Sequence, residues 1–182
     1  MALKVLKEKQ WQKPNRLPLA EDIENFRAYV SDLANSTYIE LRQGKWTPMN
    51  YRTLTECVLA LTVMFNQAFG ESLTLVEKII SKKFKRVVTG GKGSKPVPIL
   101  FSSFTQKFIR KLLEIRHRVD IVPKTNPYLF ANPKSERSWM SGYHVIRKLV
   151  TKCGAKNPSL MTSTKFRKQI ATTLQLVDYG QK

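Results

Sequence analysis

The sequence predicts an α+β fold that is mostly helical and contains one small β-hairpin sheet. Apolar residues recur at steps of three and four on both sides of the chain's centre, which is the spacing of amphipathic helices. Near the centre, two runs of β-branched and aromatic residues flank a glycine-rich connection, a pattern typical of a hairpin. The 182 residues are 42% hydrophobic, which is enough to bury the core of one domain.

The N-terminal half predicts two helices after a basic lead-in arm. Residues 1–20 lack helical periodicity and form the expected arm, and residues 21–182 form the expected domain. A first amphipathic helix is predicted over residues 21–35. Thr47 is predicted to cap a second helix that has proline at its first position. The apolar stripe of this second helix is broad enough for a central core helix and consists of Tyr51, Leu54, Cys57, Val58, Leu61, Met64 and Phe65.

The hairpin is predicted where the apolar period changes from helical to alternating. Residues 84–89 and 97–101 are the expected strands, and the glycine-rich residues 90–96 connect them. Pro98 cannot donate a ladder hydrogen bond, so the second run is expected to be an edge strand.

Three helices are predicted after the hairpin. Ser103 is expected to cap a helix whose polar side is basic, and Ser141 to open the next one, which Gly154 closes in a left-handed conformation. Between these two helices, residues 126–133 form a proline-bounded loop or a short strand. Residues 162–164 are expected to cap the last helix.

Charge is divided unevenly between the two halves of the chain. Residues 1–80 hold ten Lys and Arg against nine Asp and Glu, whereas residues 81–182 hold twenty-two against four, so +18 of the total +19 lies in the second half. A folded region with this excess is stabilised by a polyanion, and nucleic acid is the first candidate. No apolar run reaches the roughly 18 residues of a membrane-spanning helix, so no membrane partner is predicted.

Metal and cofactor chemistry is not predicted. The two cysteines, Cys57 and Cys153, and the two histidines, His117 and His144, are scattered without the spacing of a zinc site. Both cysteines lie on apolar helical faces and are expected to be intracellular thiols that pack in the core.

The segments NPYLFANP at 126–133 and KCGAKNPSLMTSTKFRKQIATTLQLV at 152–177, together with the Gly/Lys hairpin, carry a family resemblance. In this order they resemble the catalytic core of tyrosine recombinases of the phage-integrase type, in the form found in eukaryotic Crypton-like elements. The resemblance runs over residues 17–177. It implies a recombinase-like catalytic core that is incomplete at its C-terminus, and a nuclear location.

The resemblance also implies site residues. Arg167 matches the second catalytic arginine of the family, which clamps the scissile phosphate. Lys92 matches the hairpin lysine that acts as general acid, with Lys95 as the alternative if the turn register differs. The full set expected to contact DNA is Lys92, Lys95, Lys165, Arg167, Lys168, Arg110 and Lys111.

The chain departs from the family pattern at three positions. Ala68 stands where the family has its first arginine, and Thr164 stands where many members have a histidine. Tyr179 is the one tyrosine after Arg167, and it follows too soon to match the nucleophile. Lys92 and Arg167 are therefore expected to be vestigial catalytic residues, and the chain is expected to bind double-stranded DNA without cutting it.

Other functions stay open at this point. The chain could be a subunit or fragment of an active recombinase of a mobile element, with the nucleophile supplied elsewhere. It could also be a protein-interaction module, which would favour a homo-oligomer, or an RNA-binding module, because charge alone does not distinguish nucleic acids.

Overall fold

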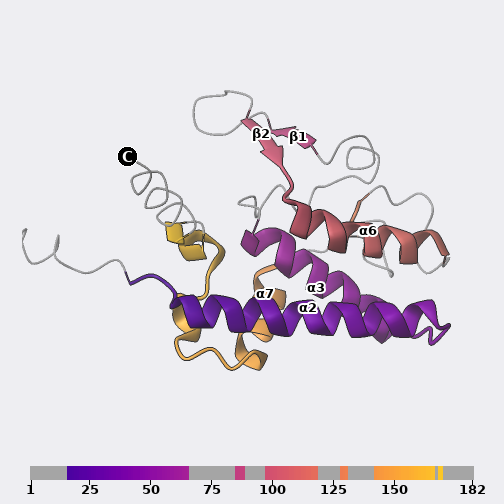
Figure 1. Cartoon of the computed structure of the whole chain (residues 1–182), viewed down its shortest axis with the longest axis horizontal. Coiled ribbons are helices and arrows are strands. Elements are labelled where there is room, and N and C mark those ends of the chain that lie inside the picture. The colour runs from indigo at the N-terminus through magenta and orange to yellow at the C-terminus, as the bar shows by residue number, and fades with distance from the viewer. Residues whose placement is uncertain are drawn as a thin grey trace, which may run out of the picture.

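The computed structural model describes residues 16–65, 85–88, 97–118, 128–130, 142–166 and 168–169. The elements in chain order are helices α2 (Ala20–Arg42) and α3 (Pro48–Phe65), strands β1 (Lys85–Val88) and β2 (Val97–Leu100), helices α6 (Ser103–Arg118) and α7 (Gly142–Lys152), and the 3-10 turn η1 (Pro158–Leu160). Helix α3 packs against α2, α6 and α7, and it is therefore the centre of the fold (Figure 1).

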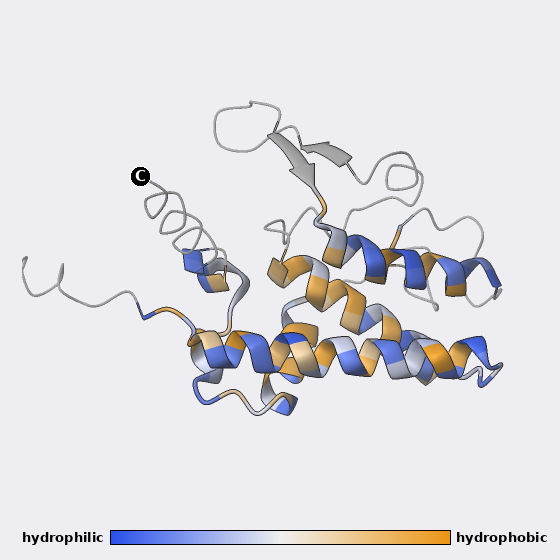
Figure 2. Cartoon of the chain, in the orientation of Figure 1, coloured by the Kyte–Doolittle hydropathy of each residue, from blue (hydrophilic) through white to orange (hydrophobic). Residues whose placement is uncertain are grey.

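Helix α3 is buried on every side over most of its length. All residues over 54–64 are buried, as the broad apolar stripe in the sequence predicted, and most of the helix is orange in Figure 2. Its two buried threonines satisfy their hydroxyls within the helix: Thr55 donates to the carbonyl of Tyr51 at 2.9 Å, and Thr62 donates to that of Val58 at 2.7 Å. These two threonines thus enter the core with their hydroxyl donors paired.

The starts of α3 and α6 are fixed by side-chain caps. The Thr47 hydroxyl oxygen accepts the backbone N–H of Asn50 at 3.0 Å, which confirms the predicted cap. For α6, the Ser102 hydroxyl oxygen accepts the N–H of Thr105 at 3.3 Å. The predicted cap at Ser103 is therefore wrong by one residue, because in a Ser-Ser pair either hydroxyl suits the pattern and the first one makes the bond.

Helix α2 is longer than the sequence predicted. It continues beyond residue 35 to Arg42, because Ala34, Thr37 and Leu41 remain on the buried side at helical spacing. Just beyond the predicted end, the Ser36 hydroxyl donates back to the carbonyl of Leu33 at 3.1 Å within the continuing helix. The extra turns bring α2 alongside α6, against which it packs.

The α+β class predicted from the sequence is wrong. Strands β1 and β2 pair antiparallel, with Lys85 opposite Leu100 and Val88 opposite Val97. Each strand has only four residues, and the pair lies beyond the start of α6, outside the helical core (Figure 1). The core of the described part of the chain is built by helices, with no sheet as one of its layers. Two strands this short offer too little apolar surface to act as a layer.

Phe166 fastens the C-terminal described residues to the helical core. Its fully buried ring meets Phe26 of α2 and Phe65 of α3 edge to face, with ring centroids 6.0 and 5.7 Å apart. Residues 163–166 are helical, and the Thr162 hydroxyl oxygen accepts the N–H of Lys165 at 3.4 Å. The cap predicted within residues 162–164 is thereby confirmed.

Candidate nucleic-acid interface

Residues 137–177, called here the acid-free segment, contain eight Lys and Arg and no Asp or Glu. Its described part comprises α7, η1 and the residues that follow to Gln169. Cations without neighbouring carboxylates in sequence give a surface where an anion meets little competition. The acid-free segment is therefore the strongest candidate for an anion-binding interface.

Helix α7 places its cations on one face. Four apolar residues are buried against the core, namely Val145, Ile146, Leu149 and Val150. The opposite face is exposed and carries Tyr143, His144, Arg147, Lys148 and Lys152. This division follows from the helical period, and it fixes three cations toward solvent.

A buried carboxylate of α2 holds the backbone of the acid-free segment. Asp22 is fully buried, and its two oxygens accept the backbone N–H groups of Lys156 and Asn157 at 2.8 and 2.9 Å. The Lys156 ammonium meets Glu21 at 2.7 Å, and the hydrogen bond from that ammonium to Glu21 raises its pKa. The chain between α7 and η1 is thus attached to the first turn of α2.

Glu56 links α3 to α7. Its side chain is almost fully buried, and it pairs with the Arg52 Nε at 2.8 Å and with the Lys148 Nζ at 3.0 Å. Two cations beside this carboxylate offset the cost of burying it, because a buried group of this kind without a partner would destabilise the fold. Lys148 therefore belongs to the internal ion pairs of the fold.

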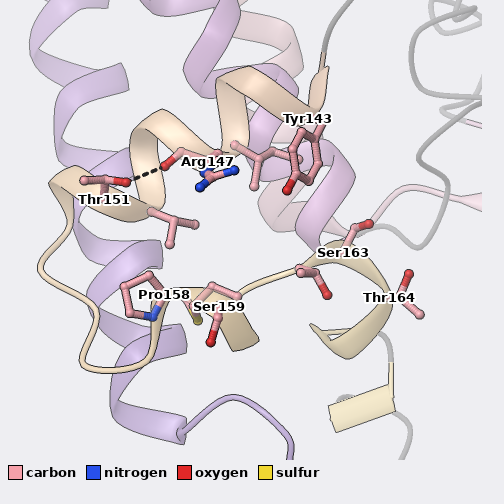
Figure 3. A pocket seen from close by; sticks show the side chains of 11 residues that line it. Tyr143, Arg147, Thr151, Pro158, Ser159, Ser163 and Thr164 are labelled. Atoms are coloured by element: carbon pink, nitrogen blue, oxygen red, sulfur yellow. Dashed lines mark hydrogen bonds between the residues drawn. The ribbon is translucent and has the colours of Figure 1, made fainter.

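A groove runs between α7 and residues 158–164. It has a volume of about 700 Å³, and Figure 3 shows the side chains that border it. Seven polar residues are among those that line it, namely Tyr143, Arg147, Thr151, Ser159, Thr162, Ser163 and Thr164. One cation and several hydroxyl-bearing residues therefore line one groove, and its described lining residues include no carboxylate.

The predicted contact residues on α6 are in different situations. Arg110 is exposed, whereas Lys111 is half-buried, donates to the Asn35 side chain of α2, and lies 5.0 Å from the centre of the Tyr38 ring. Burial, followed by the charge of Lys107, lowers the pKa of Lys111. Lys111 thus fastens α6 to α2.

Glu114 completes this α2–α6 contact. Its oxygens meet Arg118 at 3.0 Å and Arg42 at 3.4 Å, and Tyr38 donates a hydrogen bond to it. The hydrogen bond from Tyr38, with the charges of Arg42 and Arg118, lowers the pKa of Glu114. The one carboxylate of α6 is therefore neutralised within the fold.

The remaining predicted residues divide between described and undescribed parts of the chain. Arg167, Lys92 and Lys95 lie outside the described residues, so their roles stay predictions. Lys165 is half-buried and Lys168 is exposed, and both flank the anchoring ring of Phe166. The structure places these two lysines on the acid-free segment, while Arg110 and Lys111 belong to α6.

The groove and its arginine were missed by the sequence interpretation. For the α7 side of the groove the sequence did hold a signal, because Tyr143 and Arg147 are four residues apart and therefore fall on one helical face. The Ser and Thr side chains of residues 159–164 gave no such signal, because only the turn at η1 directs them to the same space as α7.

The described residues contain neither a candidate membrane-spanning helix nor a cluster of metal ligands. None of the helices in this part of the chain has the length and apolar content needed to cross a membrane. Within the same residues, no three His, Cys, Asp or Glu side chains gather as a metal site would require. Burial raises the pKa of the Cys57 thiol to about 12, so this cysteine is a core residue.

The comparisons with known proteins place the chain in no family. No family model, curated protein or solved structure matches it. The expected recombinase-like catalytic core is therefore a second correction to the fold class, because neither the helical core nor a structural match supports it.

Proposed function

We propose that this chain binds duplex DNA through the acid-free segment. The observation that carries the proposal is the concentration of eight cations and no carboxylate within residues 137–177. The described part of this segment is held on a folded core by Asp22, Glu56 and Phe166, so its charges form a fixed surface. Each phosphate that such a surface neutralises releases counterions, which favours binding.

Ion pairing elsewhere strengthens this assignment. Glu114 of α6 and Glu56 of α3 each meet two cations inside the fold, which leaves these carboxylates little attraction for further cations. The exposed cation Lys152 lies in a stretch of the sequence without Asp or Glu. A negatively charged partner is therefore favoured at this surface.

Duplex is favoured over single-stranded nucleic acid. Proteins that bind single strands stack successive bases on several exposed aromatic side chains. Of the Phe, Tyr and Trp side chains in the described ranges, Tyr143 is the exposed one, at 57%. A surface of cations and hydroxyls with a single aromatic residue suits a phosphate backbone better than a row of unpaired bases.

The test compares two double variants by fluorescence anisotropy with a labelled duplex over a salt series. Lys152→Gln with Lys168→Gln should weaken binding about fivefold or more and lower the slope of log affinity against log salt by about two, because two phosphate contacts are lost. Arg16→Gln with Lys45→Gln removes the same charge from exposed positions outside the segment and should change affinity by less than about twofold.

Equal losses in the two double variants would show that net charge alone governs binding, against an interface at this segment. Wild-type protein that binds no duplex at low salt would overturn the proposal. Tighter binding to duplex RNA than to duplex DNA would replace DNA with RNA as the partner.

A further inference from the structure

The groove between α7 and residues 158–164 has the lining of an anion site. Arg147 enters it from α7, and the hydroxyl-bearing residues Ser159, Ser163 and Thr164 border it from the other side (Figure 3). Hydroxyls and a guanidinium are the side-chain donors that phosphate oxygens accept from. None of the described residues that line the groove has a carboxylate, which would repel an anion or pair with the guanidinium.

Arg147 differs from Lys148 and Lys156 because its side chain has no ion-pair or hydrogen-bond partner among the residues that the structure describes. Lys148 is paired with Glu56 at 3.0 Å and Lys156 with Glu21 at 2.7 Å. Within the described part of the chain, the Arg147 guanidinium makes no ion pair or hydrogen bond, and only its backbone carbonyl is used, by the Thr151 hydroxyl at 2.9 Å. All five of its N–H donors can therefore turn to a ligand.

Several hydroxyls in the groove likewise lack a hydrogen-bond partner within the described part of the chain. Thr151 and Thr162 make local hydrogen bonds to backbone groups. The hydroxyls of Tyr143, Ser159 and Ser163 have no hydrogen-bond partner among the residues that the structure describes. Three hydroxyl-bearing residues and one cation that line the groove are thus without a side-chain partner in the described part of the chain.

The floor of the groove is apolar. Ile146, Val150 and Met161 line it and are buried, with exposed fractions of 5%, 2% and 3%. Low-dielectric walls strengthen the attraction between a guanidinium and a phosphate and limit its screening by salt. A contact made here should therefore contribute more to binding than a contact at a fully solvated lysine.

We propose that this groove is a phosphate subsite that holds one phosphodiester of the bound duplex. Arg147 makes the charged contact with the phosphate oxygens, and the hydroxyls of Tyr143, Ser159 and Ser163 donate to the same group. The inference rests on the proposed function, since it names where in the interface the backbone is gripped. A volume of about 700 Å³ is ample for one phosphodiester with its sugar.

The experiment compares Arg147→Gln with Lys152→Gln in the full chain. Both residues are exposed on α7 and both changes remove one positive charge, so general electrostatics is matched. Arg147→Gln should weaken duplex binding at least about tenfold, and Lys152→Gln only about two- to threefold. Arg147→Lys should fall between wild type and Arg147→Gln, because lysine keeps the charge but loses the bidentate contact.

A second readout uses inorganic phosphate alone. In ¹H–¹⁵N spectra, phosphate should shift the amide signals of residues 158–164 in wild-type protein, and Arg147→Gln should remove these shifts. Tyr143→Phe keeps the ring and removes one donor, so it should weaken phosphate binding as well. This variant serves as the test if Arg147→Gln fails to fold.

The outcomes separate the two proposals. Duplex binding in wild type with equal losses in Arg147→Gln and Lys152→Gln would overturn the subsite and leave the DNA-binding function standing. Wild-type protein that binds no duplex would overturn the function and this inference together. Phosphate shifts located away from residues 158–164 would also contradict the subsite.

Discussion

Two buried carboxylates, Asp22 and Glu56, hold the basic C-terminal residues to the helical core. Each one is paired with groups more than ninety positions away: Asp22 with the backbone of Lys156 and Asn157, and Glu56 with the side chain of Lys148. A buried charge must be matched by donors, and each carboxylate has at least one of its donors on the acid-free segment. Residues in the neutral half of the chain thus position the residues of its basic half.

At this scale, Asp22→Asn should lower the free energy of unfolding by about 2 kcal/mol. The amide keeps one acceptor oxygen and turns an NH₂ group toward the second backbone N–H, so one charge-assisted hydrogen bond is lost and the other is weakened. Urea unfolding followed by circular dichroism measures the change.

Asp32→Asn on the same helix is the matched control for Asp22→Asn. Asp32 is exposed, so its change should stay within about 0.5 kcal/mol. Equal effects of the two substitutions would mean that the Asp22 hydrogen bonds add nothing beyond the loss of one negative charge on α2.

Among the elements, α7 ends as the sequence predicted. Gly154 follows the helix with φ of 74°, in the left-handed region that glycine adopts without steric cost, which confirms the expected closure. Gly154→Ala should lower the free energy of unfolding by about 1 kcal/mol. The cost would be in the backbone alone, because an added Cβ meets no atom within 4 Å.

Thermal and urea unfolding of Gly154→Ala and Gly154→Asn give the measurement. Asparagine tolerates the left-handed region better than alanine, so Gly154→Asn should be the less destabilised of the two. Two variants of equal stability would contradict a conformational origin of the effect.

Helix starts and apolar faces could be predicted from the sequence, because they depend on neighbouring residues. Thr47 makes the expected cap, and the stripe of α3 is buried as expected. The length of α2 and the role of the strands could not, because both depend on distant packing: Thr37 and Leu41 stay helical against the core, and β1 and β2 form no layer. The groove could not be predicted for the same reason, since it exists only where η1 turns back toward α7.

For the whole molecule, the charge of +19 links stability to ionic strength. At about 10 mM salt the Debye length is roughly 30 Å, so cations across the entire fold repel one another, whereas at about 150 mM it falls to roughly 8 Å. The unfolded chain spaces these charges further apart, so repulsion favours unfolding most at low salt. Salt should therefore stabilise the protein when no polyanion is present.

Bound DNA should reverse this dependence, and the reversal is our prediction at this scale. Without DNA, the melting temperature should rise as sodium chloride increases from about 10 to 150 mM, because repulsion is screened. With saturating duplex, the melting temperature should be highest at low salt and should fall over the same range, because binding to the folded state stabilises it and salt weakens that binding. Differential scanning fluorimetry of both series on one preparation gives two curves of opposite slope. Parallel curves would mean that the duplex does not bind the folded protein, and a falling curve without DNA would mean that ion pairs such as Glu56 with Lys148 outweigh the net repulsion.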